Sequence, residues 1–509
     1  MSWIVLIALV AGSFFWSRYA GGPTSGFVLD DWSYLARARA FEGVGEGLSY
    51  TLLDRYRPFN FASSLLCHQV FDDCTLFYDV FGFASYLILL AGGYFLCRES
   101  GLSRRAWLWW SWPLLAWPAL TESFNWKNHS MLAWTYAVGV LGVATFLRYL
   151  RTGVIRWQII SCACFLLALG GYEFNVVLVA VMGCLALFAG RYKRLLCLVP
   201  QGLILGFYLG WRFHGYGWSE PRLTGGQYFG DGLSLNDLWW NLRGIVDLVA
   251  GPEWIRSVAW GLSDFAAFSP RLFYPLLAGN LLLALLLTIR MYAGDGKTSP
   301  VTASEGPAAY LWAAAAWVLG GLAVYLVFPI ANRHLLFPLL GAGWGLALLH
   351  RHIPRSFAPV IFLATALFFC ANQGTAHAWR ESGLANRKLY DYLANHRSAW
   401  QDKSRVILLT DRLSSPAGTA LKTPSFVSCF HRGNAGFIRV FALDGMILLL
   451  QPGTHIRSFL DAESGVRVEG DTVHLHERYN PDAPLTFSLD SVYLIDFADV
   501  VLADNQLKH

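Results

Sequence analysis

The chain is 509 residues long, and 55% of its residues are hydrophobic while only 14% are charged. Two or three soluble domains of this total length would carry more charge, so a lipid bilayer must be part of the solvent of this protein. The formal net charge of +5 is small for the length and gives no extended basic surface for nucleic-acid phosphates, which excludes a nucleic-acid partner.

Apolar runs follow one another over residues 1–371, and most approach the roughly 20 residues that span a bilayer. The first run follows no basic segment and precedes no small-residue cleavage motif, so we interpret it as an uncleaved helix. The runs predict about eleven transmembrane helices, at residues 3–16, 76–97, 106–121, 131–149, 157–172, 174–190, 195–211, 272–290, 309–329, 335–350 and 357–371.

Basic residues gather in the loop after every even-numbered span. Short cytoplasmic loops of membrane proteins are enriched in Lys and Arg, so these loops and the N-terminus are expected to be cytoplasmic. The long loops 21–75 and 212–271 and the C-terminus then lie on the outer side. The basic residues are Arg98, Arg104, Arg105, Arg148, Arg151, Arg156, Arg191, Lys193, Arg194, Arg290, Lys297, Arg351 and Arg355.

The composition changes after residue 371. Residues 381–400 have the pattern of an amphipathic helix, and residues 405–409 have that of a strand. We expect a transmembrane domain over residues 1–371 and a small soluble α/β domain over residues 372–509. Further short apolar runs between turn residues favour more strands, at residues 437–442, 446–450, 466–468 and 493–497.

Two adjacent carboxylates, Asp30 and Asp31, stand in the first outer loop behind an apolar lead. A carboxylate near a low-dielectric region loses solvation and persists where a cation, a metal or a proton-transfer role stabilises it. The alternative is that Asp31 only caps a helix over residues 33–40.

Arg55 and Arg57 precede Pro58 and an apolar stretch, residues 59–70, that could lie along the membrane interface as a helix. The planar guanidinium of Arg is suited to phosphate oxygens. The alternative for Arg57 is a salt bridge to a carboxylate of the same loop, which could be Asp30, Asp31 or Asp54.

The other outer connections also carry polar candidates. Glu122, Lys127 and His129 share one short turn, where Lys127 could bind an anion or could simply be solvated. Glu173 falls in a tight turn between two spans, and an acid at that depth is a functional candidate by default. The outer helix ends add Arg212, Arg333 and His334, although Arg333 could also be a snorkelling residue.

The nine cysteines form no CxxC pair, and no zinc site is indicated. Cys67 and Cys74 share one polar loop, so they could form a disulfide in an oxidising compartment.

A first outer loop that opens with Asp30-Asp31 and continues through Arg57-Pro58 into an interfacial helix resembles the GT-C superfamily of membrane glycosyltransferases. The segment Arg333-His334-x-x-x-Pro338 is similar to that family too. The resemblance implies a polyprenyl-phosphate-linked sugar donor and reaction on the outer face. Within the superfamily, the pattern is similar to enzymes of the bacterial inner membrane that decorate O-antigen, envelope glycans or pilin, including pilin arabinofuranosyltransferases.

The resemblance also implies roles for the candidate residues. Asp30 or Asp31 would be the general base that takes the proton of the acceptor hydroxyl, with inversion at the anomeric carbon. Some family members use a divalent cation, Mg or Mn, and no ligand set in this sequence decides the point. The donor phosphate would be held by Arg57, Lys127, Arg212, Arg333 and His334, with Arg55, Glu122, His129 and Glu173 as further site candidates.

Two other classes remain as alternatives. A secondary transporter also carries buried acids and arginines, but it would show repeated halves, and no internal repeat is visible. An O-antigen polymerase or ligase would share lipid-linked donors, but its arginines and histidines would lie in one late outer loop. The distinctive acids here stand in the first loop.

Overall fold

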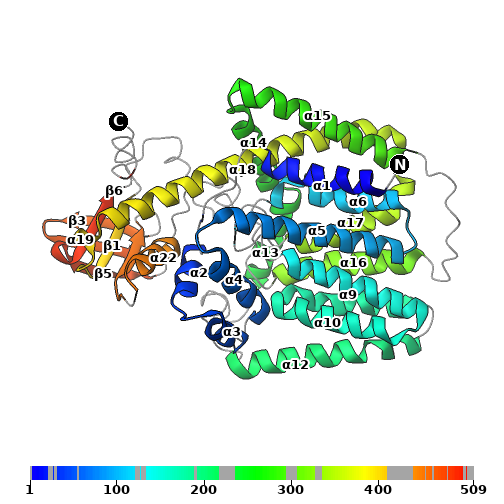
Figure 1. The fold of residues 1–509 in the computed structure, drawn as a ribbon, viewed down its shortest axis with the longest axis horizontal. Coiled ribbons are helices and arrows are strands. Elements are labelled where there is room, and N and C mark those ends of the chain that lie inside the picture. The colour runs from blue at the N-terminus through cyan, green and yellow to red at the C-terminus, as the bar shows by residue number, and fades with distance from the viewer. Residues whose placement is uncertain are drawn as a thin grey trace.

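A computed structural model shows a mostly helical protein with a small region of β-sheet near its C-terminus (Figure 1). The structure describes residues 3–20, 27, 31–53, 57–120, 127, 133–188, 192–216, 235–293, 307–326, 335–409, 440–452, 454–460, 464–477, 480–496 and 500.

Every one of the expected spans coincides with a helix, and these helices lie side by side in a bundle (Figure 1). Four of them, in Thr75–Glu99, Ala133–Thr152, Pro270–Tyr292 and Arg355–Asn395, are long and apolar enough to cross a membrane. The number of spans stays a prediction. The helices are α1 (Trp3–Tyr19), α5 (Thr75–Glu99), α6 (Arg104–Ala116), α9 (Ala133–Thr152), α10 (Ile155–Gly171), α11 (Val177–Phe188), α12 (Val199–Tyr216), α15 (Pro270–Tyr292), α16 (Pro307–Ala323), α17 (Leu336–Leu349) and α18 (Ala358–Asn395).

The bundle is apolar on the outside as well as inside. Leu203, Phe207 and Leu319 are largely exposed on helices whose buried faces are also apolar. A soluble helix would place polar residues on that outer face, so this pattern indicates a lipid environment. The inner contacts use small residues for close approach: a Cβ on Gly93 would run into the ring of Trp110.

Three helices of the first long loop cap one end of the bundle: α2 (Asp31–Arg39), α3 (Val44–Leu53) and α4 (Pro58–Phe71). The expected helices over residues 33–40 and 59–70 are confirmed. The second long loop contributes α13 (Leu235–Val249) and α14 (Pro252–Ala266), which were not predicted. Helix α14 packs closely along α18, because Gly261 and Gly374 let the two backbones meet.

The C-terminal region holds two small sheets. Parallel strands in the order β2-β1-β6 form one sheet, and antiparallel strands β3-β4-β5 form the other. The expected strands at residues 405–409, 466–468 and 493–496 are confirmed. The strands are β1 (Arg405–Leu409), β2 (Arg457–Leu460), β3 (Ser464–Glu469), β4 (Thr472–Glu477), β5 (Asn480–Ser488) and β6 (Val492–Asp496), with the short helix α19 (Arg397–Trp400) before them.

Two local predictions were wrong. Residues 437–442 and 446–450 were expected to be strands, but residues 440–450 form helix α22 (Val440–Leu450), and residues 437–439 lie outside the described part of the chain. Leu443, Met446 and Ile447 are buried at helical spacing in the contact with α2, and so short an apolar run cannot reveal that period by itself. The last span and the amphipathic helix over residues 381–400 were expected as separate elements. In the structure α18 runs through both as far as Asn395, across the expected domain boundary at residue 371, and α19 covers residues 397–400.

Candidate functional site

The first turn of α2 carries Asp31, whose side chain is fully buried. The next residue, Trp32, stacks on Tyr390 of α18 with ring centroids 5.0 Å apart and meets Phe27 edge-on at 5.7 Å. The indole nitrogen of Trp32 also donates a hydrogen bond to the carbonyl of Phe27. These contacts hold the start of α2 in place, so Asp31 is fixed in a low-dielectric position. Asp30 lies outside the described residues.

A buried histidine and a buried tyrosine lie close to Asp31, and their pairing was not predicted. The His68 Nδ1 atom is 2.7 Å from the hydroxyl of Tyr78, which donates to the carbonyl of Asp72 at 2.8 Å. A carbonyl can only accept, so the single hydroxyl proton points to Asp72 and Nδ1–H of His68 is the donor to Tyr78. Tyr78 in turn interacts electrostatically with Asp31.

Burial lowers the pKa of the His68 imidazole to about 3, so His68 is neutral at physiological pH. Its Nε2 atom then carries a lone pair that meets no hydrogen-bond donor among the residues the structure describes. The Tyr34 ring lies parallel to the imidazole at 6.3 Å. The imidazole is therefore a neutral, buried acceptor on the Asp31 side of α4.

The low pKa of His68 predicts a pH effect on stability. The folded-state pKa of His68 is below the ordinary value of about 6.5, so below pH 6.5 the unfolded chain binds a proton that the folded protein does not. The free energy of unfolding is therefore highest above pH 6.5 and falls as the pH falls toward 3. Between pH 7.5 and 5.5, wild-type protein should lose about 1 kcal/mol more than the His68→Phe variant, measured by thermal unfolding in detergent. Equal pH profiles for the two proteins would contradict a neutral His68.

Arg57, immediately before α4, forms a bidentate ion pair with Glu173 in the turn between α10 and α11. The Nε atom of Arg57 donates to Oε2 at 2.7 Å and Nη2 donates to Oε1 at 2.6 Å. The guanidinium also lies 4.1 Å from the ring centroid of Tyr172. Only 17% and 10% of the two side chains are exposed. Arg57 thus pairs with Glu173, which was not among the carboxylates named for it; two of those, Asp30 and Asp54, lie outside the described residues.

Lys127 forms a second buried ion pair, at 2.5 Å, with Asp79 of α5. Its ammonium group is almost completely buried, so the prediction that Lys127 could be solvated was wrong. Asp79 was not predicted as a site residue, although an acid four residues inside an apolar helix is a functional signal. Asp79 lies near the polar end of the expected span over residues 76–97, where a charged residue is not unusual.

The two ion pairs and Asp31 come together at one end of the bundle. Helix α4 packs against α10 at this end. The contact is close, because a Cβ on Gly170 of α10 would overlap the ring of Phe59 of α4. The indole of Trp134 in α9 donates to Ser63 of α4 at 3.1 Å. Tyr136, two residues further, interacts electrostatically with both Arg57 and Glu173. The arrangement therefore offers fixed carboxylates and fixed cations on one membrane-proximal face.

Helix α22 of the C-terminal region closes this end of the bundle against α2 (Figure 1). A Cβ built on Gly445 would lie 2.5 Å from both the carbonyl carbon of Trp32 and the backbone nitrogen of Ser33. These two atoms form the peptide bond between Trp32 and Ser33, one residue after Asp31. Only a glycine lets α22 approach the first turn of α2 so closely.

Gly445→Ala is accordingly expected to displace the start of α2. We expect it to destabilise the protein by about 1 to 3 kcal/mol, the usual cost of an overpacked contact, and to lower its activity. The matched control is Gly45→Ala in α3, where an added Cβ meets nothing within 4 Å. The control should be neutral or slightly stabilising, because Ala favours helices over Gly. Thermal unfolding of both variants checks the pair, and equal behaviour would refute the close contact.

The side chains of the remaining candidates lie outside the described part of the chain. Arg212 lies in α12, and its side chain is outside the described part of the chain. Cys67 and Cys74 are both free thiols, one buried and one exposed, so the possible disulfide is not formed. Within the described ranges, no three His, Cys, Asp or Glu side chains are grouped to hold a metal ion. Also outside the described residues are Arg55, Glu122, His129, Arg333 and His334.

No known family model and no curated protein matches the chain. The solved structures that are similar to it include the oligosaccharyltransferase of Archaeoglobus fulgidus in its apo form and the same enzyme tethered by a disulfide bond to an acceptor peptide with the NVT sequon. Each is 12% identical over 85% of this chain, with a TM-score of 0.42. The chain spans 63% and 62% of those two chains, and a likeness at this level establishes no shared activity.

Proposed function

We propose that the protein is an inverting glycosyltransferase. It would move a sugar from a polyprenyl-phosphate donor to an envelope glycan, lipid or protein acceptor, such as pilin, on the periplasmic face of the bacterial inner membrane. The observation that carries the proposal is the buried Asp31, at the start of α2, at the same end of a membrane bundle as the cations of Arg57 and Lys127.

The carboxylates supply the base in the proposed reaction. Asp30 or Asp31 accepts the proton of the acceptor hydroxyl while its oxygen forms a bond to the anomeric carbon of the donor. The bond between that carbon and the phosphate oxygen breaks, and its electron pair leaves with the polyprenyl phosphate. Attack from the face opposite the leaving group inverts the anomeric configuration. The phosphate is already a good leaving group, so no strong acid is needed beside it.

The cations act on the leaving group. Negative charge grows on the phosphate as the glycosidic bond breaks, and a fixed positive charge in a dry site stabilises it strongly. Arg57 suits this role because Glu173 and Tyr172 hold its guanidinium in one orientation before the donor binds. Lys127, Arg212, Arg333 and His334 are further proposed phosphate contacts. A divalent cation, Mg or Mn, would add to the same stabilisation of the leaving phosphate in an enzyme that uses one.

Comparing envelope polymers and pilin by intact mass tests the proposal. Cells that lack the protein should lose a mass that corresponds to a sugar on one of these acceptors. Wild-type protein should restore that mass, while the double variant Asp30→Asn/Asp31→Asn should not. Glycans and pilin that are unchanged by loss of the protein would count against a transferase, and restoration by the double variant would reject the carboxylates as the base.

A further inference from the structure

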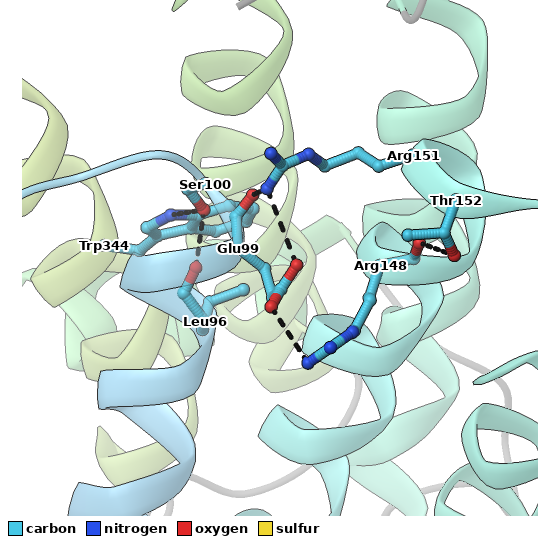
Figure 2. Close-up of polar contacts among 7 residues, drawn as sticks. All are labelled: Leu96, Glu99, Ser100, Arg148, Arg151, Thr152 and Trp344. Atoms are coloured by element: carbon cyan, nitrogen blue, oxygen red, sulfur yellow. Dashed lines mark hydrogen bonds and ion pairs between the residues drawn. The ribbon is translucent and has the colours of Figure 1, made fainter. Parts of the chain in front are cut away.

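An arginine cluster lies at the opposite end of the bundle from Asp31, where α5 ends and α9 meets α10. Glu99, the last residue of α5, lies between Arg148 and Arg151 of α9 (Figure 2). Its carboxylate is 3.4 Å from Nη1 of Arg148 and 3.5 Å from Nη1 of Arg151. Arg151 also donates to the Glu99 carbonyl at 2.8 Å. A single, mostly buried acid therefore orients two guanidinium groups.

A third arginine joins the cluster through an indole. The Arg148 guanidinium lies 4.1 Å from the ring centroid of Trp157, and that of Arg156 lies 5.2 Å from the same ring. Arg151 and Arg156 are exposed, and Arg148 is partly so. Within the part of the chain that the structure describes, Glu99 is the one carboxylate paired with any of the three. Three cations against one acid leave an excess of positive charge on a surface that is held rigid.

Apolar side chains surround the arginines on the surface. Ile155 and Ile159, in the first turns of α10, are 63% and 62% exposed, and Val154 beside them is exposed as well. Trp157, in contact with two of the three arginines, adds an indole of the kind that is typical of the boundary between lipid tails and headgroups. The surface thus combines cationic side chains with exposed apolar ones.

We infer that this surface binds the phosphodiester headgroup of an anionic membrane phospholipid. Arg151 and Arg156 contact the phosphate oxygens through their planar forks, and Arg148 adds charge from its fixed place over Trp157. The acyl chains lie along Ile155 and Ile159. A soluble anion would use the same cations but would gain nothing from the exposed apolar side chains, which is why a lipid fits the whole surface better.

The test uses the purified full chain in neutral detergent. Dioleoylphosphatidylglycerol is titrated in, and binding is followed by thermal unfolding and by native mass spectrometry. Dioleoylphosphatidylcholine tests the need for charge, and inorganic phosphate at equal concentration tests the need for the lipid. The variants are Arg156→Gln, which breaks no ion pair in the described structure, and the double variant Arg151→Gln/Arg156→Gln. Arg351→Gln, an exposed arginine just after α17, is the matched control.

Wild-type protein should be stabilised by phosphatidylglycerol and retain it, with little response to phosphatidylcholine or inorganic phosphate. An arginine near the membrane surface contributes about fivefold to such binding, so Arg156→Gln should weaken it about 5-fold and the double variant about 30-fold. Arg351→Gln should bind as wild type does. The inference is overturned if the variants keep wild-type affinity, if Arg351→Gln loses as much, or if inorganic phosphate stabilises the protein as well as the lipid does.

Discussion

One of the two substitutions Asp30→Asn and Asp31→Asn is expected to lower the rate of sugar transfer by about 10² to 10⁴ while the protein stays folded. Asn has nearly the shape of Asp but cannot accept a proton at neutral pH, so the change removes basicity and leaves packing largely intact. A residue that only capped α2 would cost about 1 kcal/mol of stability on substitution and would leave most of the activity. Transfer to a defined acceptor by purified protein separates these outcomes.

Asp73→Asn is the control for these substitutions. Asp73 also belongs to an adjacent acidic pair, but its side chain is 52% exposed and lies 3.5 Å from the guanidinium of Arg387. Its loss should leave both transfer and folding close to wild type. Should Asp30→Asn and Asp31→Asn both fold and both transfer sugar at near wild-type rates, the proposed mechanism is wrong.

Arg57→Ala is expected to reduce the use of the lipid-phosphate donor by about 10² to 10³, because the leaving phosphate loses a preorganised positive charge. Arg57→Lys should restore activity only in part, since an ammonium group cannot form the bidentate pair with Glu173. Glu173→Gln keeps the shape of the partner side chain but removes its charge, so it orients the Arg57 guanidinium less firmly. We expect its loss of donor use to be smaller than that of Arg57→Ala. Steady-state kinetics with varied donor would show the effects, and an unchanged donor dependence in Arg57→Ala would reject the assignment.

The same pair also has a stability signature. Removing one member of a buried ion pair leaves the other charge uncompensated, which costs about 3 kcal/mol or more. The double variant Arg57→Ala/Glu173→Ala should therefore destabilise the protein by less than the sum of the losses measured for Arg57→Ala and Glu173→Ala alone. The surface pair of Arg39 and Asp72, whose side chains are 40% and 53% exposed, is the control. Its disruption should cost at most about 1 kcal/mol.

The helices of the bundle could be predicted because a membrane span needs a long apolar run, and a long run is visible without knowledge of its neighbours. α22 could not be predicted, because it is only 11 residues long and its burial depends on contact with α2, more than 400 residues earlier in the chain. The length of the apolar run therefore decided whether a helix could be predicted. The continuous course of α18 was missed because its character changes from apolar to amphipathic, although no proline follows its first turn.

The candidate site was predicted in its parts but not in its pairings. Arg57 and Glu173 were each singled out, yet they are 116 positions apart, and only the packing of α4 against α10 reveals that they meet. Asp79 and His68 were overlooked because their significance comes from Lys127 and Tyr78 on other segments. Such pairings depend on tertiary contacts, which a single sequence does not display.

The unbroken course of α18 has a mechanical consequence. A helix of 38 residues is a rod about 57 Å long, and its stiffness makes it a lever rather than a hinge. Its inner part is clamped by α14 and α15, while Tyr390 near its outer end touches Trp32 beside Asp31. A force that pushes the two C-terminal sheets sideways is therefore transmitted as a tilt of the whole rod. The same tilt would pull on the tryptophan next to the buried carboxylate, so a load on the sheets and the position of Asp31 are mechanically linked.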